Sequence, residues 1–184
     1  MSRRTLARAA APALGLAVAL VAVVPATAQN APSKATLNVV GMAEFKANRY
    51  VKDGMRFGRD ITVVKSGGTL TIVNKTDQPH SFSLVKKSEL PRNMAGMEAC
   101  FSPKGVCGKL AVAHGFIDPA TGEEREEPTT PLVNVGKEGF DQPGDSVLFG
   151  PKSKTKVKIT AKKGTQLSFL CGFHSWMQGK LDVK

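Results

Sequence analysis

Alternation of apolar and polar residues in two short segments is the feature that most limits how this chain folds. Residues 69–73 read TLTIV and residues 156–160 read KVKIT, the pattern of strands with one buried and one wet face. Further runs rich in Val, Ile, Thr and Phe lie at 36–40, 61–64, 81–85, 146–149, 166–171 and 179–183. Turn residues such as Gly67 and Gly68 separate the runs. Seven or eight strands of this kind predict an all-β fold, a sandwich or a barrel.

Two longer segments break this rhythm. Residues 43–59 have a mixed period, and the sequence leaves open whether they form a loop, a short helix or a strand. Residues 86–144 contain many Pro and Gly residues and the acidic run EEREE at 123–127. We interpret them as a loop-rich insertion with little regular structure. We therefore expect one domain over residues 29–184, with the insertion inside it.

The first 28 residues have the pattern of an export signal. Arg3, Arg4 and Arg8 form a basic start. An apolar stretch follows at 9–24, and small residues at 26–28 provide a cleavage site. We expect an exported, periplasmic or extracellular protein without a transmembrane segment once the signal is removed. The sequence leaves open whether export uses the general or the twin-arginine route.

The charge balance narrows the class of partner. Three of the 26 basic residues lie in the leader and all 15 acidic residues lie after it, so the remaining chain has a formal charge of +8. An excess of this sign favours partners with acidic docking surfaces. Nucleic acid is not expected as a partner, because the lysines are scattered among the predicted strands.

The three cysteines cannot all pair with one another. Cys100 and Cys107 lie within CFSPKGVC, whose Pro and Gly residues allow the chain to turn back, so we predict a disulfide between them. Cys171 is then left over, and a leftover thiol in an exported protein needs an explanation.

The stretch CGFHSWM places Cys171, His174 and Met177 at equal three-residue steps directly after a predicted strand. A tight loop can turn side chains with this spacing toward one point. Thiolate, imidazole and thioether are soft ligands, and together they favour copper over zinc, calcium or magnesium. The alternative is ordinary packing, with Cys171 as a buried free thiol and Met177 as core filling.

His80 ends a turn and opens the predicted strand at 81–85, so it is our candidate for a further ligand. Two imidazoles, one thiolate and a weak axial thioether are the ligand set of a blue-copper electron-transfer site. On its own, His80 would be read as a structural or surface histidine. Phe173 and Trp176 flank His174 and are expected to surround its outer edge with apolar surface or to cap the core.

With these residues identified, the chain resembles the cupredoxins. The ending FLCGFHSWMQGKLDV is most similar to the ligand loop of amicyanin- and plastocyanin-like members, and the resemblance covers residues 61–85 and 144–184. It implies a Greek-key β-sandwich with one type 1 copper that cycles between Cu(I) and Cu(II). The insertion at 86–144 departs from the small members of the family and leaves the partner in doubt.

The resemblance also implies a role for each candidate residue. The implied trigonal ligands are His80, Cys171 and His174, with Met177 as the axial ligand. Ser81 is implied to hydrogen-bond across to the ligand loop. The implied function is that of an electron carrier, not an enzyme, which exchanges single electrons with a redox donor and acceptor.

Other copper proteins were weighed against this interpretation. Leu167 stands where the binuclear copper domain of cytochrome oxidase has a second cysteine, and three histidines are too few for a multicopper oxidase. A protein that sequesters or delivers Cu(I) remains an alternative. Met94 and Met97 are its candidate second copper site, with Met42, Met55 and His114 as possible helpers. A copper enzyme with an open coordination position is a third possibility.

Overall fold

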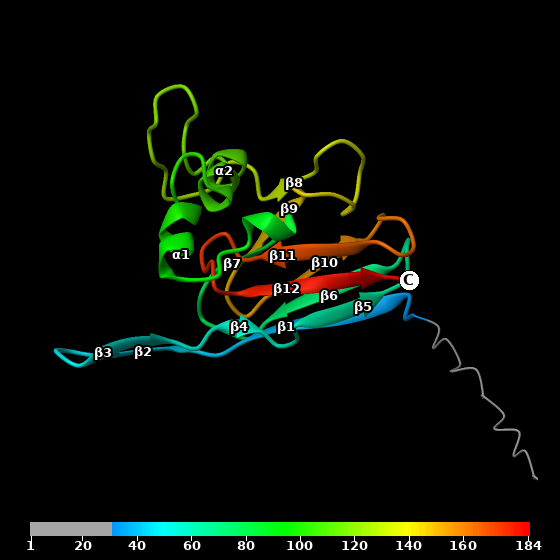
Figure 1. Cartoon of the computed structure of the whole chain (residues 1–184), viewed down its shortest axis with the longest axis horizontal. Helices are drawn as coiled ribbons and strands as arrows, with labels where there is room; N and C mark the ends of the chain where they lie inside the picture. The colour runs from blue at the N-terminus through cyan, green and yellow to red at the C-terminus, as the bar shows by residue number, and fades with distance from the viewer. Residues whose placement is uncertain (1–30) are drawn as a thin grey trace, which may run out of the picture.

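The computed structural model describes residues 31–184. They form two β-sheets, a projecting hairpin and a group of short helices (Figure 1). The predicted export signal at 1–28 lies outside the described residues. Among the residues that are described, no helix is long and apolar enough to cross a membrane.

The first sheet has the strand order β10-β6-β1-β4. Its strands are β1 (Lys34–Val40), β4 (Arg56–Phe57), β6 (Thr69–Asn74) and β10 (Lys154–Lys158). β1 runs parallel to β6, whereas β4 and β10 pair antiparallel with their neighbours. Along β6, Leu70 and Ile72 are fully buried and alternate with half-buried residues, which is the predicted pattern of inward and outward side chains.

The second sheet has the strand order β5-β12-β11-β7-β9-β8. Its strands are β5 (Ile61–Val64), β7 (His80–Val85), β8 (Leu132–Val133), β9 (Ser146–Phe149), β11 (Gln166–Leu170) and β12 (Gln178–Val183). β5 and β12 are parallel, and the other pairs are antiparallel. β7 is buried along its whole length, on both faces.

One hydrophobic core joins the two sheets into a sandwich. Phe57 of the first sheet meets Phe82 and Phe169 of the second edge to face, at ring-centroid distances of 6.5 and 4.9 Å. Each of the eight runs predicted as strands contributes a strand to these sheets. The predicted all-β sandwich is therefore confirmed.

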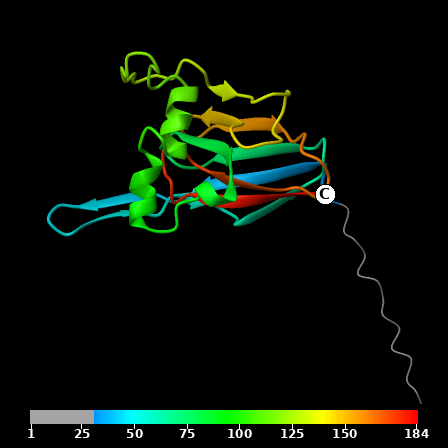
Figure 2. The ribbon, with the colours of Figure 1, turned by 45° about the horizontal axis from the view of Figure 1, so that its top comes forward.

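Residues 43–59, which the sequence left open, contain a β-hairpin and β4. The hairpin consists of β2 (Ala43–Lys46) and β3 (Tyr50–Asp53). Its turn places Asn48 at a φ of 58°, in the left-handed region that Asn tolerates. Phe45 and Val51 face each other across the two strands, and each is 76% exposed. The hairpin projects from the same end of the sandwich as α1 (Figures 1 and 2).

The segment 86–144 has more regular structure than the sequence predicted. It contains the short helices η1 (Lys87–Glu89), α1 (Met94–Cys100) and α2 (Val106–Ala113) as well as β8. The Asn93 side chain caps α1 by accepting from the Gly96 N–H at 2.8 Å. The disulfide between Cys100 and Cys107 joins the end of α1 to the start of α2. A local cap and a covalent link thus order a stretch whose composition is typical of loops.

Candidate metal centre

Strand pairing brings His80 and Cys171 together although 91 residues separate them in the chain. His80 opens β7, and Cys171 follows the last residue of β11. The two strands are antiparallel neighbours, with Leu170 opposite Ser83, so the start of one lies beside the end of the other. The Ser81 N–H points at the Cys171 sulfur, 3.3 Å away.

The loop after β11 is closed by its own backbone. The His174 N–H donates to the Cys171 carbonyl at 3.2 Å, and the Met177 N–H donates to the His174 carbonyl at 2.8 Å. The Cys171 N–H in turn donates to the Met177 carbonyl at 3.0 Å. The three-residue spacing seen in the sequence is therefore the spacing of two consecutive turns. These turns hold the three predicted loop ligands at fixed positions on one small ring of backbone.

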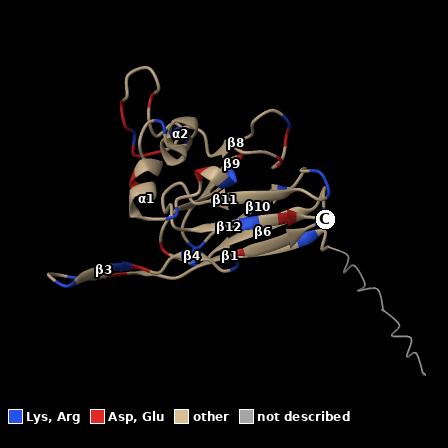
Figure 3. Cartoon of the chain, in the orientation of Figure 1, with Lys and Arg blue, Asp and Glu red and all other residues tan. Residues whose placement is uncertain are grey.

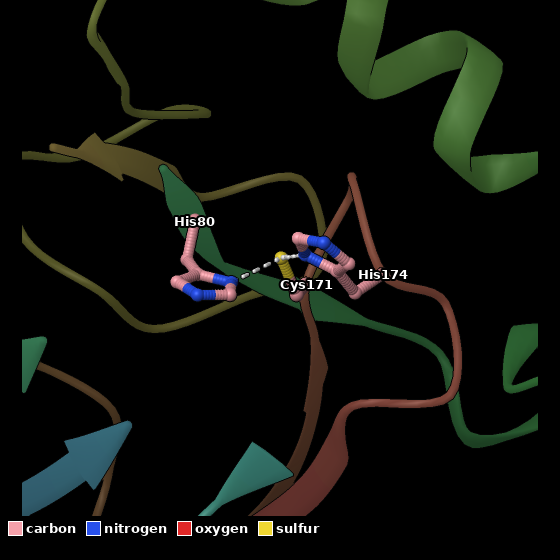
Figure 4. A group of neighbouring side chains, drawn as sticks. All are labelled: His80, Cys171 and His174. Carbon is pink, nitrogen blue, oxygen red and sulfur yellow. Dashed lines mark hydrogen bonds between the residues drawn. The ribbon is translucent and has the colours of Figure 1, made fainter. Parts of the chain in front are cut away.

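Three of the four predicted ligands meet at one point (Figure 4). The Nδ1 atoms of His80 and His174 each lie 3.6 Å from the Cys171 Sγ, and the ligand atoms of all three residues lie within 4.8 Å of one another. His80 and Cys171 are fully buried, and His174 is half-buried. Met177 is also buried, in the same core cluster as Cys171. The donor set of two nitrogens and a sulfur suits copper.

His80 is held from behind by residues of the turn that precedes it. Its Nε2 lies 2.8 Å from the Thr76 hydroxyl, which also lies 2.8 Å from the Asn74 Oδ1. The Asn74 amide donates to the carbonyls of Gln78 and Gly150, both at 2.8 Å. The Thr76 hydroxyl donates its proton to the Asn74 Oδ1, so it accepts from the His80 Nε2, which therefore carries the proton. Partners of this kind fix the orientation of a ligating imidazole.

Ser81 makes the contact across to the ligand loop that the resemblance implied. Its hydroxyl accepts a hydrogen bond from the Gly172 N–H at 2.7 Å. Its own N–H reaches the Cys171 sulfur. One residue of β7 thus holds both the cysteine and the residue after it.

Burial sets the protonation of the three candidate ligands. It lowers the pKa of His80 to about 4, an effect that the charge of His174 strengthens and Asp53 opposes. It also lowers the pKa of His174, again against Asp53. Burial raises the pKa of the Cys171 thiol, and hydrogen bonds from Ser81 and the loop backbone partly offset this. In the metal-free protein the imidazoles are neutral with lone pairs available, and a metal would displace the thiol proton.

The outer edge of the site is aromatic. The Trp176 ring stands edge-on to the His174 ring at a centroid distance of 5.2 Å and is 39% exposed. Its Nε1 donates to the Met55 carbonyl at 3.2 Å. On the other side, Phe173 packs edge-on against Phe116 of the 86–144 segment, at 5.6 Å. His174 is therefore the candidate ligand that approaches the surface, between two aromatic side chains.

A cavity of about 330 Å³ opens beside the ligand loop, between it and the 86–144 segment. Gly172 and Phe173 line one side, and His114 and Phe116 line the other. His114, named above as a possible helper of a second copper site, is buried and hydrogen-bonded through both ring nitrogens.

The candidates for a second copper site are not all brought together. Met94 and Met97 line one shallow pocket with Trp176. The other possible helpers, Met42, Met55 and His114, do not line that pocket, and Met55 and His114 are buried. Sequence reasoning also missed Thr76. The only signal for it was a hydroxyl residue four positions before the histidine, in a turn.

The similarities of this chain to known proteins are confined to solved structures. No protein-family model matches the sequence, and no curated protein matches it either. Among solved structures, auracyanin from Roseiflexus castenholzii matches with 15% identity over 84% of this chain and 98% of its own, at a TM-score of 0.44. The purple cupredoxin from Nitrosopumilus maritimus matches with 12% identity over 82% and 99%, at 0.40.

Auracyanin A, a "blue" copper protein from Chloroflexus aurantiacus, matches with 19% identity over 82% of this chain and 99% of its own, at a TM-score of 0.40. An amicyanin structure also matches, with 10% identity and the same TM-score, so the comparison does not single out amicyanin. These TM-scores are below 0.5, and the metal centre is therefore argued from its own geometry.

Proposed function

We propose that the protein binds one copper ion in a mononuclear type 1 site and carries single electrons between redox partners. His80, Cys171 and His174 would be the trigonal ligands, and Met177 the axial one. The observation that carries the proposal is the convergence of two imidazole nitrogens on one thiol, within 4.8 Å, in a site where His80 and Cys171 are fully buried and His174 is half-buried. Copper in such a site supplies a one-electron couple.

The protein's part in this function is to keep the ligands in place. Thr76 orients His80, Ser81 holds the loop, and backbone turns set the spacing of the loop ligands. Ligands fixed in this way need little movement when the charge of the metal changes, which favours fast transfer. The half-buried edge of His174 is the proposed exit for the electron, because apolar surroundings let a partner approach closely without reaching the metal.

The distribution of charged residues over the surface supports a proposal for the charge of the redox partner and for the side from which it approaches. Figure 3 shows basic residues spread over several strands, β12 among them, and acidic residues gathered in the loop after α2. Glu124 of that acidic run lines the cavity beside Phe173. We therefore propose that an acidic donor or acceptor approaches from the opposite side, past Trp176 and the hairpin with Lys46 and Lys52. The rate of electron exchange with such a partner should fall as salt is raised.

A single absorption spectrum tests the copper site. The purified protein loaded with Cu(II) should be intensely blue or green, and Cys171→Ser should abolish the colour. Ser175→Ala, in the same loop but outside the proposed ligand set, is the matched control and should keep the colour. A wild-type complex without colour would reject the proposal. Unchanged spectra on adding azide would count against an enzyme with an open position.

Export is part of the same proposal. The leader at 1–28 would be removed, leaving a single domain that is periplasmic or extracellular. Determining the first residue of the protein purified from the host's outer compartment would test this. Finding Met1 there, or the whole protein in the cytoplasm, would contradict it.

A copper-sequestering or copper-delivering protein is the second candidate, because Met94, Met97 and Trp176 line one surface pocket near the ligand loop. Thioethers are soft ligands that suit Cu(I). Titration of Cu(I) with the wild type and with Met94→Leu/Met97→Leu distinguishes the two. A second equivalent that only the wild type binds, and that passes readily to an acceptor, would favour delivery.

A further inference from the structure

Four buried polar side chains form a continuous row from the ligand loop to the 86–144 segment. The Ser81 and Ser83 hydroxyls are 2.8 Å apart, and Ser83 and Ser146 are 2.6 Å apart. The Ser146 hydroxyl lies 2.7 Å from the His114 Nε2. Each of these residues is at most 2% exposed. We call this row, with the Gly172 N–H that donates to Ser81, the serine relay.

His114, at the end of the serine relay away from the ligand loop, sets the direction of every hydrogen bond in it. The His114 Nδ1 lies 2.6 Å from the Thr130 carbonyl, which can only accept, so Nδ1 carries a proton. Burial lowers the pKa of His114, although Thr130 opposes this, so the neutral ring is favoured and its Nε2 is an acceptor. Ser146 must then donate to His114. Ser83 donates to Ser146 and Ser81 donates to Ser83, which leaves the Ser81 oxygen to accept from Gly172.

The serine relay exists because the 86–144 segment covers a face that would otherwise be wet. Ser81 and Ser83 are two residues apart on β7 and therefore point to the same side, away from Phe82. Ser146 stands directly opposite Ser83 on β9. On this side Leu110 of α2 packs with Leu170 in a second hydrophobic cluster. Helix α2 thus excludes water from the serines. His114, the C-cap residue of this helix, lies at the end of the row.

We propose that His114 is a positioning residue for the metal centre: by accepting from Ser146, it orients the serine relay so that the Ser81 hydroxyl points away from the Cys171 sulfur and holds the loop at Gly172. This inference rests on the proposed copper function for its redox consequence. Ser81 lies against that sulfur, with its N–H 3.3 Å away. When the relay is broken at Ser146 or His114, the Ser83 hydroxyl loses its acceptor and turns to donate to the Ser81 oxygen. The Ser81 proton then has the sulfur as its neighbouring acceptor.

Breaking the serine relay should shift the reduction potential of the copper site in one direction only. Hydrogen bonds to the cysteine sulfur are one of the factors that tune the potential of such sites. An added hydrogen bond to the sulfur reduces the electron density that it gives to Cu(II), and this favours Cu(I). Breaking the serine relay should therefore raise the reduction potential, without changing any ligand.

Three variants test the relay. Ser146→Ala removes its middle member, His114→Phe removes the terminal acceptor at similar size, and the double variant combines them. Arg125→Gln is the matched control, because Arg125 lies in the same segment and its ion pair is with Asp118, outside the relay. Ser83→Ala replaces His114→Phe in the cycle if that variant does not fold.

The first readout uses the metal-free protein and does not depend on copper. Nitrogen NMR of the wild type should show His114 with its proton on Nδ1, and the Gly172 amide signal should move in Ser146→Ala and His114→Phe but not in Arg125→Gln. A proton on Nε2, or a Gly172 signal that stays in place, would overturn the inference. If no copper binds at all, the proposed function fails while this readout still decides the relay.

The second readout is the reduction potential of the copper-loaded protein. Both single variants should raise it, and the double variant should raise it no further than one of them, because members of one hydrogen-bond chain are not additive. A merely structural role for His114 predicts lower thermal stability with an unchanged potential. That result, or fully additive shifts, would contradict the relay.

Discussion

The two imidazoles of the candidate metal centre have opposite surroundings. His80 is fully buried and is held from behind by Thr76 and Asn74. His174 is half-buried, lies on a loop and borders the exposed Trp176. The difference suggests a division of labour, in which one side fixes the geometry of the site and the other gives access to it.

Removing each imidazole should have the largest effect and should separate the two sides. His80→Gly and His174→Gly should both lose the blue colour and bind copper far more weakly, by more than the roughly 10–100-fold typical for loss of an outer partner. Free imidazole should restore the colour only in His174→Gly, since that gap opens toward solvent. Absorption titrations check this. Equal rescue of both variants would show that the two sides are equally accessible.

The buried side should also make the metal-free protein sensitive to acid. The pKa of His80 falls from 6.5 to about 4, so between these values the unfolded chain binds a proton that the folded one does not. The stabilisation that comes from neutral His80 is therefore complete above pH 6.5. It is lost as the pH is lowered toward 4, by up to about 3 kcal/mol. Urea unfolding at several pH values measures this. His80→Gln should flatten the profile, and an equally steep profile in that variant would assign the effect elsewhere.

Loss of the support behind His80 should have a smaller effect. Thr76→Val keeps the shape of the side chain but removes the partner of Nε2, and copper affinity should fall about 10–100-fold. Thr71→Val on β6 is the matched control and should leave the affinity unchanged. Competition with a chelator of known affinity gives the numbers. Equal affinities of Thr76→Val and the wild type would mean that packing alone orients His80.

A change at the exposed side of the site, next to His174, should alter the rate of electron exchange and leave the copper affinity unchanged. Trp176→Ala removes the aromatic border of His174 but touches no proposed ligand, so the spectrum should stay the same. Electron self-exchange, measured by NMR line broadening in mixtures of the two oxidation states, should slow severalfold. Phe45→Ala, which removes an exposed aromatic from the hairpin, should not slow it. A slower rate in both variants would show that the apolar part of the hairpin contacts the partner as closely as Trp176 does.

The sequence analysis predicted the features that leave a pattern in neighbouring residues and missed the features that do not. Alternation in residues 69–73 reports burial directly, and the strand there was predicted. The hairpin β2–β3 gave no such pattern, because it is exposed on both faces. α1 and α2 were missed, since a cap and a disulfide order them in a Gly- and Pro-rich stretch.

The metal centre shows the same rule. The spacing of Cys171, His174 and Met177 is a local property of two turns, so it was readable in the chain. The pairing of Ser83 with Ser146 depends on strand register across 63 residues, and no local pattern encodes it. His114 was therefore considered only as a possible helper of a second copper site, although it ends a buried row of hydrogen bonds.

The disulfide between Cys100 and Cys107 has a consequence for how the protein matures. Three thiols emerge from the ribosome, and any pairing that uses Cys171 consumes the one thiol that the proposed site needs. The correct pair is seven residues apart, whereas each wrong pair closes a much longer and entropically costlier loop. The smaller entropic cost of the short loop thus favours the disulfide between Cys100 and Cys107, which leaves Cys171 for the proposed site. In the exported protein proposed above, the burial of Cys171 would then protect the remaining thiol from oxidation.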